Sequence, residues 1–176
     1  MRRLMLLRHA KSDRPDGVDD HERPLAKRGR KVSPLMGRYM ADEALVPDLA
    51  VVSTARRARE TWKLLRPAFA REIVLRDEPR IYEASAGAIL DVIRETEAGV
   101  CSLLLVGHNP GLHDLALELV GKASRSDLSR LRPTYPTAGL VVIDFDIRNW
   151  SEASAGLAHL ERFETPKSVG AVAALR

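Results

Sequence analysis

Short apolar runs alternate along this chain with longer stretches in which apolar residues recur every three or four positions. The runs from Arg3 to Leu7 and from Leu103 to Val106 are nearly continuous, a pattern typical of strands buried on both faces of a parallel sheet. From Ser85 to Glu97, the apolar positions follow the spacing of one buried helical face. This alternation predicts an α/β fold, a three-layer α/β/α sandwich with a mostly parallel central sheet.

The other elements are predicted from the same two periodicities. Pro34 removes a hydrogen bond from the helix expected around it and predicts a kink there. Ser85 stands where a residue caps the helix that follows it. The further strands are expected over 49–53 and 73–75, with an antiparallel pair over 140–145 and 157–163, and the further helices over 25–44, from 56 and from 112.

The length and cysteine content of the chain limit the number of domains and disulfides it can have. A chain of 176 residues suits one domain with its own core, which we place over 1–165, followed by a loose tail over 166–176. The single cysteine, Cys101, excludes an internal disulfide. Its setting in the apolar run CSLLLV predicts a buried position in a strand.

The charge pattern and the first residues of the chain limit which kinds of binding partner are expected. The net charge is +4, yet Lys and Arg are scattered and aromatic residues make up only 5% of the chain. This disfavours nucleic acid, which proteins bind with clustered basic and aromatic residues, and favours attraction of a small anion. The first apolar run stops at Arg8, too short for a signal peptide or a membrane span. We therefore expect a cytoplasmic protein without nucleic-acid or membrane contacts.

Residues suited to a phosphoryl anion follow three of the predicted strands. Arg8 and His9 end the first, Ser53 with Arg57 follows the second, and His108 follows the strongest. Open parallel sheets bind ligands at the carboxyl ends of their strands. Arginine offers a rigid planar fork of donors for phosphoryl oxygens, and the turn GHNPG adds the free N–H groups of a helix start.

These residues lie in motifs that resemble those of a known family. The segments LLRHAKS, STARRARET and LVGHNPG occur in the order found in the histidine phosphatase superfamily, also called phosphoglycerate-mutase-like. The segment ERPLAKRG also resembles the family's entry into its first helix. The resemblance covers roughly residues 2 to 165 and is strongest to the short phosphohistidine phosphatases of SixA type. It implies a phosphoglycerate-mutase-like catalytic domain.

The resemblance also implies roles for individual residues. It makes His9 the nucleophile, with Arg8, Arg57 and His108 holding the phosphoryl oxygens. The sequence departs from the family pattern at Ala10, where a glycine is usual, and at Ala26, where a capping threonine is common; neither change removes a catalytic group. Further expected contributors are the general acid Glu83, in IYEAS, and the substrate contacts Lys11, Ser12 and Asn109.

Several neighbouring residues are expected to have ordinary structural roles. Arg56 and Arg59 are expected on the solvated face of a helix, and Tyr82 is expected to pack. His108 and His113 are five residues apart, off the spacing that places two metal ligands on one helical face. We expect no metal and no cofactor.

The predicted reaction is phosphoryl transfer to neutral His9 followed by hydrolysis. One ring nitrogen of His9 is expected to be held by a backbone carbonyl, and Arg8 and Arg57 to lower its pKa. Only residues 76–84 lie between the third strand and the next helix, so no lid subdomain is expected. An open pocket favours a phosphohistidine protein as the substrate. The alternatives are a phosphatase for small phosphate monoesters and a non-catalytic anion or nucleic-acid binding module.

Overall fold

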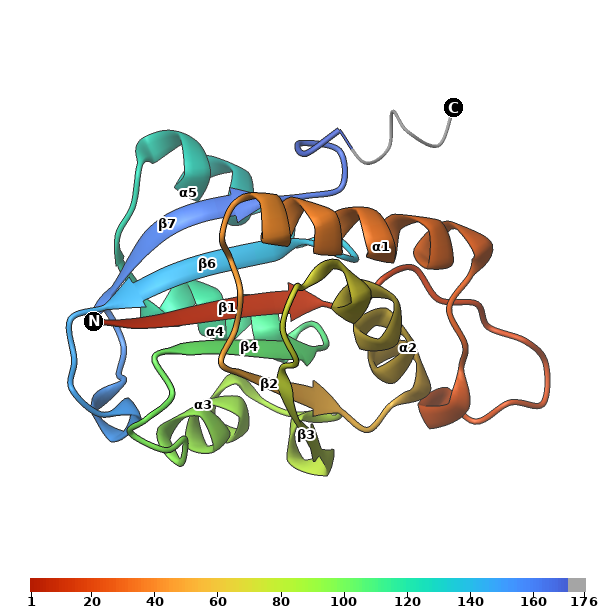
Figure 1. Cartoon of the computed structure of the whole chain (residues 1–176), viewed down its shortest axis with the longest axis horizontal. Helices are drawn as coiled ribbons and strands as arrows, with labels where there is room; N and C mark the ends of the chain where they lie inside the picture. Colours follow the sequence, from red (N-terminus) through yellow and green to blue (C-terminus); the bar gives the residue numbers. More distant parts are fainter. Residues whose placement is uncertain (171–176) are drawn as a thin grey trace.

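The computed structural model describes residues 1–170 and contains one seven-stranded sheet between layers of helices. Along the sheet the strands run in the order β3-β2-β4-β1-β6-β7-β5. Figure 1 shows this order from β3 to β7. β1 pairs in parallel with β4, and β2 in parallel with β3 and β4, while β6 runs antiparallel to β1 and β7. The elements are β1 (Arg2–Arg8), α1 (Lys27–Asp42), β2 (Leu49–Ser53), α2 (Arg56–Leu65), β3 (Val74–Glu78), α3 (Ala86–Arg94), β4 (Ser102–Gly107), α4 (Gly111–Leu119), β5 (Val120–Lys122), α5 (Arg125–Leu131), β6 (Leu140–Phe145) and β7 (Ala158–Glu164).

Alternate side chains of the central strands build two separate cores, one on each face of the sheet. Leu4 and Leu6 of β1 belong to the core covered by α3 and α4. Met5 and Leu7 of the same strand belong to the core covered by α1 and α2. Both sets are fully buried, which explains why the apolar runs of these strands are continuous. The predicted three-layer α/β/α sandwich with a mostly parallel sheet is confirmed.

The register of the parallel strands places their carboxyl ends together. Leu7 of β1 pairs with Val106 of β4, and Val52 of β2 pairs with the same residue. The residues that follow these three strands therefore emerge at one edge of the sheet. This is the edge at which open α/β sheets bind ligands.

The helix starts and the proline inside the first helix can be compared with what the sequence predicted. Ala26 stands at the N-cap of α1 without a side-chain hydrogen bond, in keeping with the absence of a capping threonine. α1 continues through Pro34 to Asp42, and Ser33 Oγ donates to the carbonyl of Gly29 at 2.7 Å. On the other face, Ser85 caps α3 as predicted, since its side chain accepts from the amide of Ala88.

The structure corrects the prediction that Cys101 is buried in a strand. Cys101 is exposed, and β4 begins only at Ser102. The backbone amides of both residues donate to the carboxylate of Asp48, at the point where the strand begins. The apolar run of β4 proper starts at Leu103, so the cysteine lies outside the buried part of the sequence pattern.

Other differences occur at the edges of the fold. β3 continues to Glu78 through polar residues, because an edge strand has a neighbour on one side only and is not covered like a central strand. β5 and α5 were not predicted: one has three residues and the other seven, too short for a periodic signal. Residues 166–170 form turns. Residues 171–176 of the expected tail lie outside the described part of the chain, so the division at residue 165 stays a prediction.

Candidate active site

The segments that follow β1, β2 and β4 enclose a pocket of about 360 Å³. Most of the lining side chains are polar or charged, and five of them are arginine or lysine. Such a composition suits a small anion. The lining residues are Arg8, His9, Lys11, Ser12, Arg14, Asp20, Arg23, Arg57, Tyr82, Glu83, His108, Asn109 and Thr137.

His9 is held in one orientation at the end of β1. Its Nδ1 lies 2.8 Å from the carbonyl oxygen of Ala10, so the ring donates there and Nε2 carries the free electron pair. Arg57 donates to that Nε2 from its own Nε at 3.3 Å. The amide of Ala10 donates to Thr61 Oγ1 at 3.0 Å, which ties the turn after the strand to α2. The backbone-held tautomer expected from the sequence is present.

The environment of His9 keeps its imidazole neutral. Only 7% of the residue is exposed, and burial is the largest cause that lowers its pKa from 6.5 to about 3. The hydrogen bond to Ala10 opposes this shift, while the charges of His108, Arg57 and Arg8 add to it. The arginines therefore act in the expected direction, but desolvation has the larger effect. A neutral ring with its Nε2 unprotonated is a competent nucleophile.

Arg57 is fixed by Asp20, a residue that the sequence motifs did not single out. The guanidinium donates to the backbone oxygen of Asp20 at 2.8 Å and to its carboxylate at 3.2 Å. The same carboxylate accepts hydrogen bonds from Tyr82 and Arg23. These bonds, with Tyr82 the largest cause, hold the pKa of Asp20 well below its usual value. Asp20 thus remains ionised and orients the arginine beside His9.

Arg8 and Asn109 are anchored to one carbonyl and retain buried atoms for a ligand. Arg8 donates from a terminal nitrogen to the carbonyl of Tyr135 at 3.1 Å, and Asn109 donates to the same oxygen at 2.8 Å. Arg8 Nε and Asn109 Oδ1 are buried without a hydrogen-bond partner among residues 1–170. Burial also lowers the pKa of Arg8. An unpaired buried donor next to the pocket favours binding of an acceptor such as a phosphoryl oxygen.

His108 is oriented by Ser53, at the end of the neighbouring strand. The amide of Ala55 donates to Ser53 Oγ at 3.2 Å, and the hydroxyl lies 2.7 Å from His108 Nε2. The hydroxyl has one proton and a second lone pair, so it can donate to Nε2 or accept from it, and either contact orients the ring. Nδ1 of the ring is buried without a partner in the described chain. Burial, followed by the charge of Arg57, lowers the pKa of His108 to about 4.

The two imidazoles lie close together and form one wall of the site. The ring centroids of His9 and His108 are 5.1 Å apart, and the ring of Tyr82 approaches His108 edge-on at 5.5 Å. Tyr82 packs as expected, and it also lines the pocket and donates to Asp20. No local pattern in the sequence distinguished this tyrosine from a core residue.

The remaining predicted residues lie at the margin of the pocket. Glu83 is exposed and has a left-handed backbone with φ of 50°, which is uncommon for a residue with a side chain. The start of α4 packs tightly beside it, since a Cβ at Gly111 would lie 2.1 Å from the carbonyl oxygen of Ala84. Lys11 and Ser12 also line the pocket. The Ser12 hydroxyl accepts from Arg23 at 2.7 Å, so part of its bonding capacity is already used.

Comparisons with known proteins agree with this geometry. The family described as "Histidine phosphatase superfamily (branch 1)" matches residues 4–99. An uncharacterized protein of Mycobacterium tuberculosis is 33% identical over 166 residues, which span 92% of this chain and 100% of that protein. The chain belongs to the histidine phosphatase superfamily.

Solved structures of the family match nearly the whole chain. One from Agrobacterium tumefaciens, provisionally named phosphohistidine phosphatase SixA, is 31% identical with a TM-score of 0.79, covering 94% of this chain and 98% of that one. Another from Nakamurella multipartitia, with the same provisional name, is 25% identical with a TM-score of 0.82, covering 94% and 96%. Membership of this family supports phosphatase activity for the chain.

The sequence led us to expect neither a membrane-spanning helix nor a metal site. No helix among residues 1–170 is long and apolar enough to cross a membrane. In the same part of the chain, no three His, Cys, Asp or Glu residues gather as metal ligands. Cofactor-independent activity stays a prediction.

Proposed function

We propose that this member of the histidine phosphatase superfamily hydrolyses phosphohistidine in proteins through a covalent phosphoryl intermediate on His9. The observation that carries the proposal is the gathering of two neutral imidazoles and two guanidinium groups around one pocket of about 360 Å³. A tetrahedral phosphoryl group needs several oxygen-binding groups and one in-line nucleophile. Here Arg8, Arg57 and His108 are the candidates for binding the oxygens, and His9 is the candidate nucleophile.

In the first step, His9 Nε2 attacks phosphorus and the bond from phosphorus to the substrate nitrogen breaks. The Nδ1–H of His9 remains bonded to Ala10, so the ring keeps its orientation as positive charge develops on it. Arg57, Arg8 and His108 bind the phosphoryl oxygens and stabilise the charge spread over them. The departing imidazole of the substrate takes a proton from water and leaves as the neutral ring, and the hydroxide formed is neutralised by the proton that the second step releases through Glu83.

In the second step, water attacks the phosphoryl group on His9 and releases inorganic phosphate. Glu83 lines the pocket and is the candidate base for this water. A positioned base contributes on the order of 10²- to 10⁴-fold in rate. The cleaved bond returns its electron pair to Nε2, which regenerates the neutral nucleophile.

Two features favour a phosphohistidine protein over a small phosphate monoester. Only the short 3₁₀ turn Pro79–Ile81 and a few loop residues separate β3 from α3, so no lid subdomain is inserted between these two elements. Relatives at 31% and 25% identity are also provisionally named for phosphohistidine. The proposed partner is therefore a phosphorylated protein in the cytoplasm, and the reaction needs no cofactor.

The decisive experiment compares His9→Ala with the wild-type protein on several phosphorylated compounds. The substrates are a phosphohistidine peptide, phosphoimidazole, sugar phosphates and a nucleotide. We expect the wild type to hydrolyse the phosphohistidine peptide best and to form an acid-labile phosphoenzyme that His9→Ala lacks. His159→Ala, at an exposed histidine on β7, is the matched control. Full turnover by His9→Ala would show that the proposed nucleophile is wrong.

Glu83→Gln separates the two substrate classes. A phosphate ester has a poor leaving group and needs an acid, whereas the nitrogen of phosphohistidine leaves readily. The substitution should therefore reduce hydrolysis of an ester by on the order of 10²-fold and change the first step with phosphohistidine far less. Single-turnover phosphorylation of the enzyme measures that step directly. An equal loss on both substrates would argue against a phosphohistidine specialist.

A further inference from the structure

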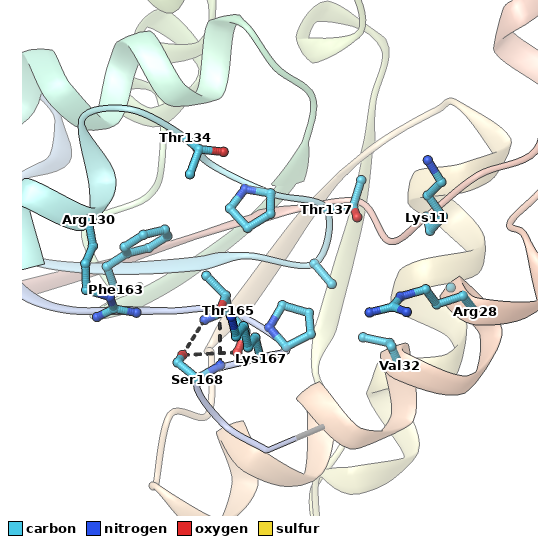
Figure 2. Close-up of a pocket in the computed structure, with 14 residues that line it drawn as sticks. Lys11, Arg28, Val32, Arg130, Thr134, Thr137, Phe163, Thr165, Lys167 and Ser168 are labelled. Carbon is cyan, nitrogen blue, oxygen red and sulfur yellow. Dashed lines mark hydrogen bonds between the residues drawn. The ribbon is translucent and has the colours of Figure 1, made fainter. Parts of the chain in front are cut away.

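A second and larger cavity, of about 710 Å³, lies next to the catalytic pocket. α1, α5, the loop before β6 and the segment after β7 surround it (Figure 2). Figure 2 shows Arg28 and Val32 on one side of the space and Arg130 with Phe163 on the opposite side. Its volume lies within the range typical of sites for small ligands or side chains, on the order of 300–1,000 Å³.

The two cavities meet at Lys11 and Thr137, which line both of them. Lys11 is held there by the close approach of α1, because a Cβ at Gly29 would lie 2.2 Å from the Lys11 carbonyl oxygen. The amide of Ala26 also donates to this carbonyl at 2.8 Å. A substrate that reaches from His9 past Lys11 therefore enters the larger cavity.

The walls of the larger cavity are mainly apolar. Val32, Ala138 and Phe163 contribute buried side chains, and Pro136 and Pro166 contribute rings. These groups offer a surface on which an aliphatic or aromatic side chain gains free energy by leaving water. The catalytic pocket lacks such a surface, so the larger cavity suits the part of a substrate that does not react.

The rim of the same cavity is positively charged. Arg130 stacks over the ring of Phe163 at 5.2 Å and pairs with Asp127 at 3.3 Å. The side chains of Lys11, Arg28 and Lys167 have no hydrogen bond or ion pair with any residue of 1–170, and no Asp or Glu lines the cavity. Three cations without an ion pair in the described residues, around an apolar surface, are complementary to a segment that carries both carboxylates and an apolar side chain.

We propose that this cavity binds an acidic segment of the phosphoprotein next to its phosphohistidine, with one apolar side chain inserted between α1 and β7. The inference rests on the proposed function, because it assigns the part of a protein substrate that flanks the reacting group. Lys11 and Thr137 connect the two sites, so one polypeptide segment spans both. The cavity thus selects among phosphoproteins, while His9 performs the reaction on each.

The test uses three synthetic phosphohistidine peptides of one length and the minimal substrate phosphoimidazole. One peptide has Asp, Glu and Leu beside the phosphohistidine, the second has Lys in place of the acids, and the third has Ser in place of Leu. We expect the first peptide to have the lowest KM with the wild type. In the double variant Arg28→Glu, Lys167→Glu this KM should rise about tenfold at low salt, since each reversed rim charge changes an exposed attraction into a repulsion.

The control variant is Arg38→Glu, which changes the same residue type at another exposed position of α1 outside both cavities. It should keep the wild-type KM for every peptide, and all variants should keep the wild-type kcat/KM for phosphoimidazole. Equal KM values for the three peptides would overturn the proposal. So would an equal effect of Arg38→Glu, or a dimer of this protein that dissociates in the double variant, which would assign the cavity to a second copy. If phosphoimidazole and all peptides remain unhydrolysed while a phosphate ester is turned over, the proposed function fails and this inference fails with it.

Discussion

Acid should destabilise this protein through its two active-site histidines, and replacing His9 by Gln should remove part of that effect. In the folded protein, burial lowers the pKa from 6.5 to about 3 for His9 and about 4 for His108. Below about pH 6.5 the unfolded chain binds protons at both rings, whereas the folded protein binds them only near the lowered values. Stability is therefore lost as the pH falls from about 6.5 toward 4 and 3.

The magnitude follows from the two pKa values of each ring. Between pH 7 and pH 5, protonation of the unfolded state lowers the free energy of unfolding by about 2 kcal/mol for His9 and by a similar amount for His108. His9→Gln removes one of these contributions. The variant should consequently lose about 2 kcal/mol less than the wild type over this range, whatever its stability at pH 7.

Urea unfolding at pH 5, 6 and 7, followed by circular dichroism, measures this difference. Other titrating groups affect the wild type and the variant alike, so they cancel in the comparison. His159→Gln, at an exposed position of β7, should follow the wild-type pH dependence. If the curve of His9→Gln runs parallel to that of the wild type, then burial does not hold His9 neutral and the basis of the proposed nucleophile is refuted.

Three further predictions concern the residues that position the site. Asp20→Ala frees Arg57 from its carboxylate partner and should lower kcat/KM for phosphoimidazole by on the order of tenfold. The far-ultraviolet circular dichroism should change little. Unchanged kinetics would mean that Asp20 does not orient the arginine. Ser53→Ala leaves His108 Nε2 buried without a partner and should cost about 1–3 kcal/mol of stability and reduce kcat. A loss of stability alone would contradict the role of Ser53 in orienting the ring. Gly29→Ala places a Cβ 2.2 Å from the Lys11 carbonyl oxygen and should lower the free energy of unfolding, measured with urea, by about 1–3 kcal/mol. An unchanged value would show that the start of α1 and the loop at Lys11 can move apart freely.

The exposed Cys101 shows a limit of reading burial from an apolar run. The residue precedes the buried run Leu103–Val106, and its amide and that of Ser102 donate to Asp48 where the strand begins. Where a strand begins depends on which backbone groups find partners in the neighbouring segment. Those partners lie far apart in the chain, so local hydrophobicity did not reveal where β4 begins.

The sequence by itself determined the layered fold and the residues at the ends of the central strands. Continuous apolar runs can be buried only between two helical layers, and a parallel sheet brings its carboxyl ends to one edge. For this reason the motifs around Arg8, His9, Arg57 and His108 predicted a single site. These predictions rest on periodicity and connectivity, which are local properties of the chain.

Only the tertiary structure decided how these groups are oriented, charged and connected to the rest of the surface. Asp20 and Tyr82 come from separate loops and meet at Arg57, and the low pKa of His9 arises chiefly from burial by many neighbours. The second cavity likewise combines α1, α5 and the segment after β7. Hydrogen-bond geometry, desolvation and cavity shape depend on distances between remote segments, and sequence periodicity does not specify those distances.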